Sequence, residues 1–193
     1  MITTVYFVRH AEPDTSIHED LIRPLTEKGT DDCKYVTQFL KDKNIQIALS
    51  SPYKRSVDTI LPFAQEIGLQ IETIADFRER RVESGWIEDF NGFVKRQWAD
   101  FSYKLSDGEC LSEVQQRNIK ALEKILAQHS GKNIVIGTHG TALSTMINYY
   151  DETYGYEDFQ KIAGVFPWLV VMKFDGQTCV EIEKIDLFEL DEK

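Results

Sequence analysis

The chain has 193 residues, a formal net charge of −10 at pH 7, and hydrophobic and charged fractions of 42% and 28%. These fractions are ordinary for a globular protein and fit poorly to a disordered chain, a collagen or a coiled coil. The 32 acidic residues outnumber the 22 basic ones and repel phosphate backbones, so we expect no nucleic acid and no membrane surface as a partner. At about 150 residues per domain, we expect one domain over residues 1–193.

The apolar runs and the cysteines of the sequence indicate where in the cell we expect the protein. The longest apolar run, Val165 to Met172, is far too short to span a bilayer. Three cysteines stand far apart in the sequence, at Cys33, Cys110 and Cys179, and an odd number cannot all pair within one chain. We therefore expect reduced thiols in a cytoplasmic protein.

In chain order, the first half alternates strands with helices. The predicted elements are a strand at 3–8, an irregular loop at 11–24, a helix from Thr26, a strand at 45–49, a helix from Pro52 to Gly68 and a strand at 69–74. The strands are short β-branched or aromatic runs, and the helices carry apolar residues at helical spacing. Proline favours the first turn of a helix, and glycine favours the position just after its end.

The second half continues the alternation and ends in a hairpin. The predicted elements are a helix from Ser112 towards His129, a strand at 133–137, a helix after Gly140, and paired strands at 168–174 and 178–185. Ser112, with Gln115 three residues later, predicts a capping box at the start of the first of these helices. Strands that alternate with helices predict an α/β fold, a three-layer sandwich with a mostly parallel central sheet flanked by helices.

The segment over about 86–109 differs from the rest because aromatic residues crowd into a polar stretch. Its aromatic side chains lie near one face if much of the segment is helical. One hypothesis is a small helical insertion that packs its aromatics on the main domain. The other is a cap over the active site. An insertion can serve both roles, so both hypotheses stand.

Polar residues of one chemical type follow the predicted strands, which is where ligands bind in open α/β sheets. They are Arg9 and His10 after the first strand, Ser50–Pro52 and Arg55 after the second, Arg78–Arg80 after the third, and Thr138–Gly140 after the fourth. Guanidinium groups bind phosphate oxygens, imidazole serves as a nucleophile or donor, and a carboxylate carries protons. A single histidine at a strand end is most often structural, but the shared placement predicts phosphoryl chemistry.

Five segments also match known motifs, in order and at compatible spacing, over nearly the whole chain. They are Val8-Arg9-His10, Ser51-Pro52-Tyr53-Lys54-Arg55 with Thr59, Phe77-Arg78-Glu79-Arg80, Gly108-Glu109-Cys110 and Thr138-His139-Gly140. In these segments the chain resembles the histidine phosphatases, the phosphoglycerate mutase-like superfamily. It departs from their usual pattern at Ala11, where glycine is common, over Pro13–Ser16, and at Cys110, which replaces a common serine.

The resemblance implies a reaction through a phosphohistidine, with no metal or other cofactor, because arginines supply the positive charge and repel a divalent cation. The implied catalytic residues are His10 as nucleophile, Glu79 as proton carrier and His139 as donor, and the implied phosphate-binding residues are Arg9, Arg55 and His139. The family's glycine four positions after the acidic residue is missing, and Gly85 lies six positions after Glu79. This spacing leaves Glu83 open as the proton carrier, although the neighbouring Arg80 favours Glu79.

The favoured function is a metal-independent phosphomonoesterase that hydrolyses a small phosphorylated metabolite. The alternatives are a phosphoglycerate mutase-type phosphotransfer, a phosphoprotein phosphatase and a catalytically silent phosphate-binding module. Similar mutases carry longer insertions than a chain of 193 residues holds, which favours hydrolysis. The aromatic segment counts against the open site that a phosphoprotein needs. The sequence carries no signature of a particular metabolite or of an oligomeric state.

Overall fold

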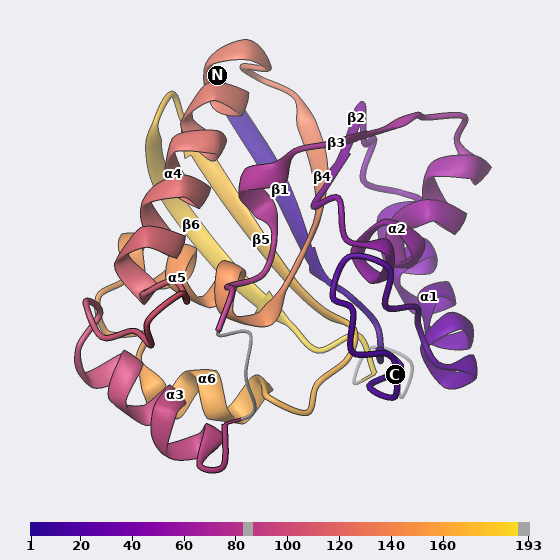
Figure 1. The fold of residues 1–193 in the computed structure, drawn as a ribbon. Coiled ribbons are helices and arrows are strands. Elements are labelled where there is room, and N and C mark those ends of the chain that lie inside the picture. Colours follow the sequence, from indigo (N-terminus) through magenta and orange to yellow (C-terminus); the bar gives the residue numbers. More distant parts are fainter. Residues whose placement is uncertain (83–86, 189–193) are drawn as a thin grey trace.

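The computed structural model describes residues 1–82 and 87–188, and within them six strands form one sheet (Figure 1). The strands are β1 (Ile2–Arg9), β2 (Ile47–Ser50), β3 (Ile71–Thr73), β4 (Asn133–Thr138), β5 (Trp168–Asp175) and β6 (Thr178–Ile185). Their order is β3-β2-β4-β1-β5-β6. The first four in this order run parallel, β5 is antiparallel to β1, and β6 is antiparallel to β5. The predicted mostly parallel sheet is confirmed.

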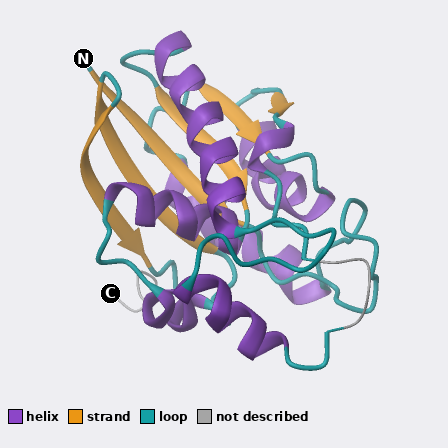
Figure 2. Cartoon of the chain, turned by 60° about the vertical axis from the view of Figure 1, so that its left-hand side comes forward, coloured by secondary structure: helices purple, strands orange, loops and turns teal. Residues whose placement is uncertain are grey.

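Helices cover both faces of this sheet (Figure 2). The helices are α1 (Glu27–Leu40), α2 (Lys54–Glu66), the 3-10 helix η1 (Ala75–Phe77), α3 (Phe90–Ala99), α4 (Leu111–Gln128), α5 (Gly140–Tyr150) and α6 (Tyr156–Ile162). In β1, Val5 and Phe7 belong to the apolar cluster that α4 and α5 complete. The alternate residues Tyr6 and Val8 belong to the cluster that α1 and α2 complete. Both faces of a central strand are thus buried, and the predicted three-layer sandwich is confirmed.

The start of α4 corrects the predicted capping box. The helix begins at Leu111, and the carboxylate of Glu113 accepts a hydrogen bond from the backbone N–H of Cys110 at 2.9 Å. The N–H of Ser112 instead donates to a carbonyl of the preceding loop at 3.0 Å. Cys110 therefore occupies the cap, and the Ser112–Gln115 prediction is wrong. Both pairs have the same spacing, and the path of the preceding loop selects between them.

Other predicted boundaries shift as well, and β2 begins at Ile47 rather than at residue 45. α2 begins at Lys54, so Pro52 lies in the turn before the helix rather than in its first turn. The hydroxyl of Ser51 accepts a hydrogen bond from the N–H of Tyr53 at 3.2 Å within that turn. β3 is shorter than the predicted strand at 69–74 and pairs on one side only, with β2.

α3 and α6 stand apart from the sandwich, beyond the carboxyl ends of the parallel strands (Figure 1). They pack together through aromatic rings, with 5.5 Å between the ring centroids of Trp98 in α3 and Phe159 in α6. A helix within 86–109 was predicted, and Trp98 also joins the main apolar cluster. α6 was not predicted, because its seven residues are too few to show an apolar period. Trp86 lies outside the described residues.

Candidate active site

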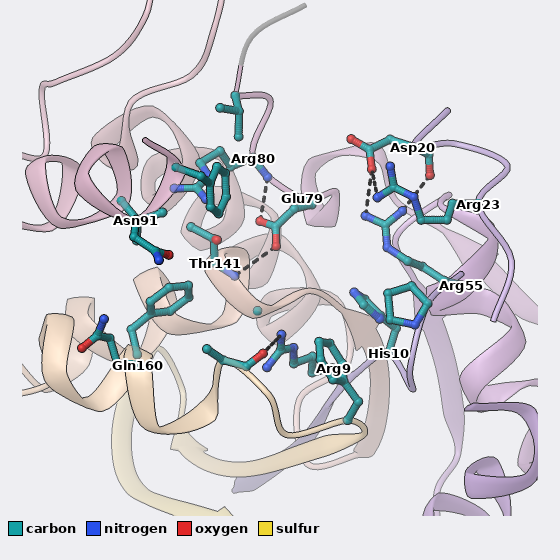
Figure 3. A pocket seen from close by; sticks show the side chains of 18 of the residues that line it. Arg9, His10, Asp20, Arg23, Arg55, Glu79, Arg80, Asn91, Thr141 and Gln160 are labelled. Carbon is teal, nitrogen blue, oxygen red and sulfur yellow. Dashed lines mark hydrogen bonds and ion pairs between the residues drawn. The ribbon is translucent and has the colours of Figure 1, made fainter. Parts of the chain in front are cut away.

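The carboxyl ends of β1, β2 and β4 meet at one edge of the sheet. The register pairs Arg9 with Thr138 and Ser50 with Gly137, so the three strands end at the same level. A Cβ atom at Gly137 would lie 2.7 Å from the Ser50 hydroxyl, so glycine permits this close packing. A cavity of about 420 Å3 opens at this edge (Figure 3). Its walls include four predicted site residues, Arg9, His10, Arg55 and Glu79.

His10 directly follows β1 and is buried, and one of its ring nitrogens is engaged. Its Nδ1 lies 2.8 Å from the carbonyl oxygen of Ala11, which can only accept a hydrogen bond. Burial, and then the charges of Arg55 and Arg9, hold the pKa of His10 well below its ordinary value. The ring of Phe166 stacks against it, with 5.6 Å between centroids. The neutral ring therefore carries its proton on Nδ1, and Nε2 keeps a lone pair.

The chain segment that carries His10 is tied to α2. The N–H of Ala11 donates to the hydroxyl of Thr59 at 2.9 Å, and this hydroxyl donates to the carbonyl of Arg55 at 2.7 Å. Thr59 lies one helical turn after Arg55, which accounts for their spacing in the motif. His10 and Arg55 are therefore held in a fixed spatial relation.

Arg55 lies in the first turn of α2 with only 3% of its side chain exposed. Its Nη1 donates to the carbonyl of Asp20 at 2.7 Å, and its Nη2 lies 3.4 Å from the Asp20 carboxylate. Arg23 pairs with the same carboxylate at 2.8 Å. All three residues line the cavity (Figure 3). An anionic ligand in the cavity therefore competes with Asp20 for the two guanidinium groups.

Arg9 is largely engaged by the connection between α6 and β5. Its Nη1 donates to the carbonyls of Ile162 and Val165, and its Nη2 donates to that of Ala163 at 3.1 Å. Its Nε is buried and has no partner among the described residues. Burial lowers the pKa of the Arg9 guanidinium to about 10, so it stays charged at neutral pH. Arg9 thus brings positive charge to the cavity but has few unused N–H groups.

His139 follows β4 and packs edge-on against His10, with 5.3 Å between ring centroids. Its Nε2 lies 2.8 Å from the hydroxyl oxygen of Ser51. Its Nδ1 is buried and finds no partner in the described part of the chain. Burial, and then the charge of Arg55, hold the pKa of His139 well below its ordinary value. The structure brings His139 to His10, although His139 is not among the residues that line the cavity.

Glu79 lies in the cavity wall, between the side that holds Arg55 and the side that holds Asn91 and Gln160 (Figure 3). Its carboxylate accepts hydrogen bonds from the backbone N–H of Arg80 at 2.7 Å and from that of Thr141 at 3.1 Å. Thr141 belongs to the first turn of α5, where the helix dipole favours negative charge. Glu83, the alternative proton carrier, lies outside the described residues.

Several residues in the cavity wall have no role predicted from the sequence. Arg80 is buried and lines the cavity, where its Nη1 bonds Gln97 and its Nε has no partner among the described residues. Arg80 belongs to the motif Phe77-Arg78-Glu79-Arg80, so the motif could have indicated that Arg80 lies at the site. Other wall residues come from α3 and α6 and include Phe90, Asn91, Val94, Tyr156, Phe159 and Gln160. Their positions depend on how the two helices face each other, which no local pattern records.

Other expectations concern metals, thiols and membranes. In residues 1–82 and 87–188, no three His, Cys, Asp or Glu side chains gather so that they could hold a metal ion. Cys33, Cys110 and Cys179 form no disulfide with one another. None of the helices in the same described ranges is both long enough and apolar enough to cross a membrane.

Comparison with known proteins places the chain in a family. Residues 5–183 match the histidine phosphatase superfamily (branch 1). Phosphoserine phosphatase 1 of Hydrogenobacter thermophilus is 27% identical over 158 aligned residues, and the alignment covers 72% of each chain. A probable phosphoglycerate mutase, GpmB of Serratia proteamaculans, is 28% identical over 158 aligned residues, covering 75% of this chain and 73% of the relative.

A solved structure shows the same fold. The structure of a mycobacterial glucosyl-3-phosphoglycerate phosphatase with VO3 has a TM-score of 0.78 at 14% identity, covering 95% of this chain and 98% of the other. With a family match over nearly its whole length, the protein belongs to the histidine phosphatase superfamily (branch 1). The resemblance inferred from five short motifs is confirmed, and membership supports phosphatase activity in general.

Proposed function

We propose that the protein is a metal-independent phosphomonoesterase that hydrolyses a small phosphorylated metabolite through a phosphohistidine on His10. The observation that carries the proposal is the hydrogen bond between Nδ1 of His10 and the Ala11 carbonyl. It leaves the lone pair on Nε2, in the wall of a cavity that also holds Arg55. The relatives named phosphoserine phosphatase and phosphoglycerate mutase support a small phosphorylated substrate.

In the first step, Nε2 of His10 attacks phosphorus and the bond from phosphorus to the leaving oxygen breaks. Glu79, protonated at this stage, gives its proton to that oxygen, so the leaving group departs as a neutral alcohol. Arg55 and Arg9 offset the negative charge of the phosphoryl oxygens. His139 donates from Nδ1, which has no partner in the described residues, to an oxygen of the phosphoryl group.

In the second step, the Glu79 carboxylate takes a proton from a water molecule. The water oxygen bonds to phosphorus and the bond from phosphorus to Nε2 of His10 breaks. This step releases inorganic phosphate, returns neutral His10 and leaves Glu79 protonated for the next cycle. Its hydrogen bonds from two backbone N–H groups hold the Glu79 carboxylate in place for this proton transfer.

The segment over about 86–109 is proposed to cap this site within a single domain. Phe90, Asn91 and Val94 of α3 line the cavity, facing Phe159 and Gln160 of α6. In Figure 3, Asn91 and Gln160 lie on the side of the cavity opposite Arg55. The leaving group of the substrate occupies this side, since His10 and Arg55 hold the phosphoryl group at the other.

The test is hydrolysis of p-nitrophenyl phosphate in EDTA, combined with rapid trapping of the enzyme during turnover. We expect equal release of p-nitrophenol and inorganic phosphate, and a protein-bound phosphate that is stable to base and labile to acid. Nitrophenol release that requires an added alcohol as phosphate acceptor would favour a mutase. Phosphate binding without turnover of any phosphomonoester would favour a silent binding module.

A further inference from the structure

An ion pair outside the cavity holds the chain segment that carries Glu79. Arg117, in α4, pairs with Glu109, with 2.9 Å between Nε and Oε1 and 3.2 Å between Nη2 and Oε2. Only 11% of the Arg117 side chain and 13% of the Glu109 side chain are exposed. Removing two charges from water is costly, and a buried pair is tolerated where its other donors and acceptors are also satisfied.

The remaining hydrogen bonds of Arg117 all go to the backbone around Glu79. Its Nη1 donates to the carbonyls of Asp76 at 2.6 Å and Arg78 at 2.9 Å. Its Nη2 donates to the carbonyl of Glu79 itself at 3.2 Å. One guanidinium group therefore holds three carbonyls of the segment that joins η1 to the cavity wall.

Glu109 holds the same segment from its other end. Its Oε2 accepts a hydrogen bond from the backbone N–H of Arg81 at 2.9 Å, and its Oε1 accepts one from Nη2 of Arg78 at 2.7 Å. These bonds, with those of Arg117, lower the pKa of Glu109 although burial raises it. Contacts on both sides of Glu79 thus come from a single ion pair.

This segment has no regular structure of its own to place a carboxylate. After η1 ends at Phe77, no helix or strand contains Arg78 to Val82. Backbone groups of such a segment need side-chain partners when strands and helices supply none. A small displacement of a proton donor from the leaving oxygen costs a large factor in rate.

We propose that the Arg117–Glu109 pair is a positioning device that holds Glu79 in line with the leaving oxygen. The inference rests on the proposed function, in which Glu79 protonates that oxygen. Neither Arg117 nor Glu109 touches the substrate in this scheme. Their effect is therefore confined to the part of the reaction that depends on the proton of Glu79.

Two aryl phosphates whose leaving groups differ in basicity separate this role from a merely structural one. p-Nitrophenolate leaves without protonation, whereas the phenolate of phenyl phosphate is far more basic and depends on a proton donor. The measurement is kcat/KM for each substrate, because this constant reports the steps up to formation of the phosphohistidine. Glu79→Gln is expected to lower kcat/KM for phenyl phosphate by a factor about a hundredfold larger than the factor for p-nitrophenyl phosphate.

Arg117→Lys keeps the charge but replaces the guanidinium fork by one nitrogen. We expect Arg117→Lys to lower kcat/KM for phenyl phosphate by a factor about tenfold larger than the factor for p-nitrophenyl phosphate. In the double variant with Glu79→Gln, the ratio of the two substrates should match that of Glu79→Gln alone, because both changes act on one proton transfer. Gln115→Ala is the matched control. Gln115 lies on the same helix and bonds Thr145 and Asn148, but makes no bond to the segment around Glu79.

The proposal would be overturned if Arg117→Lys lowered kcat/KM equally for both substrates, or lowered it for neither. If thermal melting shows that Arg117→Lys does not fold, the same two-substrate comparison is made with Glu109→Gln. Loss of the fold in both variants would show that the ion pair serves stability alone and would overturn the proposal. A Glu79→Gln variant that slows both substrates equally would instead contradict the role of Glu79 in the proposed function. The two failures are therefore distinguishable.

Discussion

Two kinds of chain segment place the side chains of the cavity. His10 lies at a strand end and Arg55 in the first turn of a helix, and both are buried. By contrast, Asp20, beside Arg55, stands in an irregular loop, and Glu79 follows a 3-10 turn, each held by hydrogen bonds between side chains and backbone. The difference teaches that the groups we propose for phosphoryl transfer, His10 and Arg55, are placed by the ends of regular elements. Glu79, the group we propose as proton donor, is placed by a connection, and connections tolerate change better than the core does.

The largest effect is expected where the sheet places the nucleophile. His10→Ala should lower kcat for p-nitrophenyl phosphate by at least about a thousandfold, because no phosphohistidine forms without its Nε2. The fold should persist, as judged by thermal melting, since the ring packs at the rim rather than between sheet and helices. His18→Ala, in the exposed part of the loop, is the control and should retain full activity. Substantial turnover by His10→Ala would rule out the covalent mechanism.

A second large effect is expected at Arg55, in the first turn of α2. Arg55→Ala should lower kcat/KM for p-nitrophenyl phosphate by about a hundredfold to a thousandfold, as removal of a buried transition-state donor does. Its neighbour Lys54 is exposed and pairs with Asp58 at 2.6 Å, and such surface pairs contribute at most about 1 kcal/mol. Lys54→Ala should therefore leave kcat/KM nearly unchanged. Similar losses in the two variants would place Arg55 outside phosphate binding.

Burial of two histidines should also make stability depend on pH. The pKa values of His10 and His139 are held well below the ordinary value in the folded chain, chiefly by burial. As pH falls below about 6.5, the unfolded chain takes up protons at both residues before the folded chain does, so the free energy of unfolding decreases. Urea unfolding at about pH 7.5 and about pH 5.5 measures this loss. His139→Gln should reduce the pH dependence of the free energy of unfolding, and an unchanged pH dependence in this variant would contradict the assignment.

The smallest effect is expected at Asp20, in the loop beside Arg55. Asp20→Asn removes the carboxylate that competes with a phosphoryl group for Arg55 and Arg23, so KM for p-nitrophenyl phosphate should fall. The Asp20 side chain is 48% exposed, and an exposed pair is worth about 0.2–1 kcal/mol, or up to about fivefold in KM. The gain should shrink as salt is added. Asp14→Asn, in the same loop, is the control, and a rise of KM in Asp20→Asn would contradict the competition.

Much of the sandwich and its site could be predicted because the signals are local. Short β-branched runs and helical apolar spacing marked β1, β4 and the main helices, and alternation of the two predicted the layers. The cap of α4 was placed two residues too late, at Ser112, since two pairs fitted one capping pattern and a loop contact selected Cys110. α6 was missed because its seven residues are too few to show an apolar period.

The sequence alone determined which residues stand at the ends of parallel strands. Since such ends meet at one edge, the meeting of Arg9, His10 and His139 followed from the order of elements. Only the tertiary structure decided that Asp20 occupies Arg55 and that Arg117 and Glu109 hold the backbone of Glu79. These are bonds between side chains and distant backbone groups in irregular segments. Such bonds produce no periodic pattern in the sequence. Each of them depends on where a loop lies in space rather than on the residues next to it in the chain.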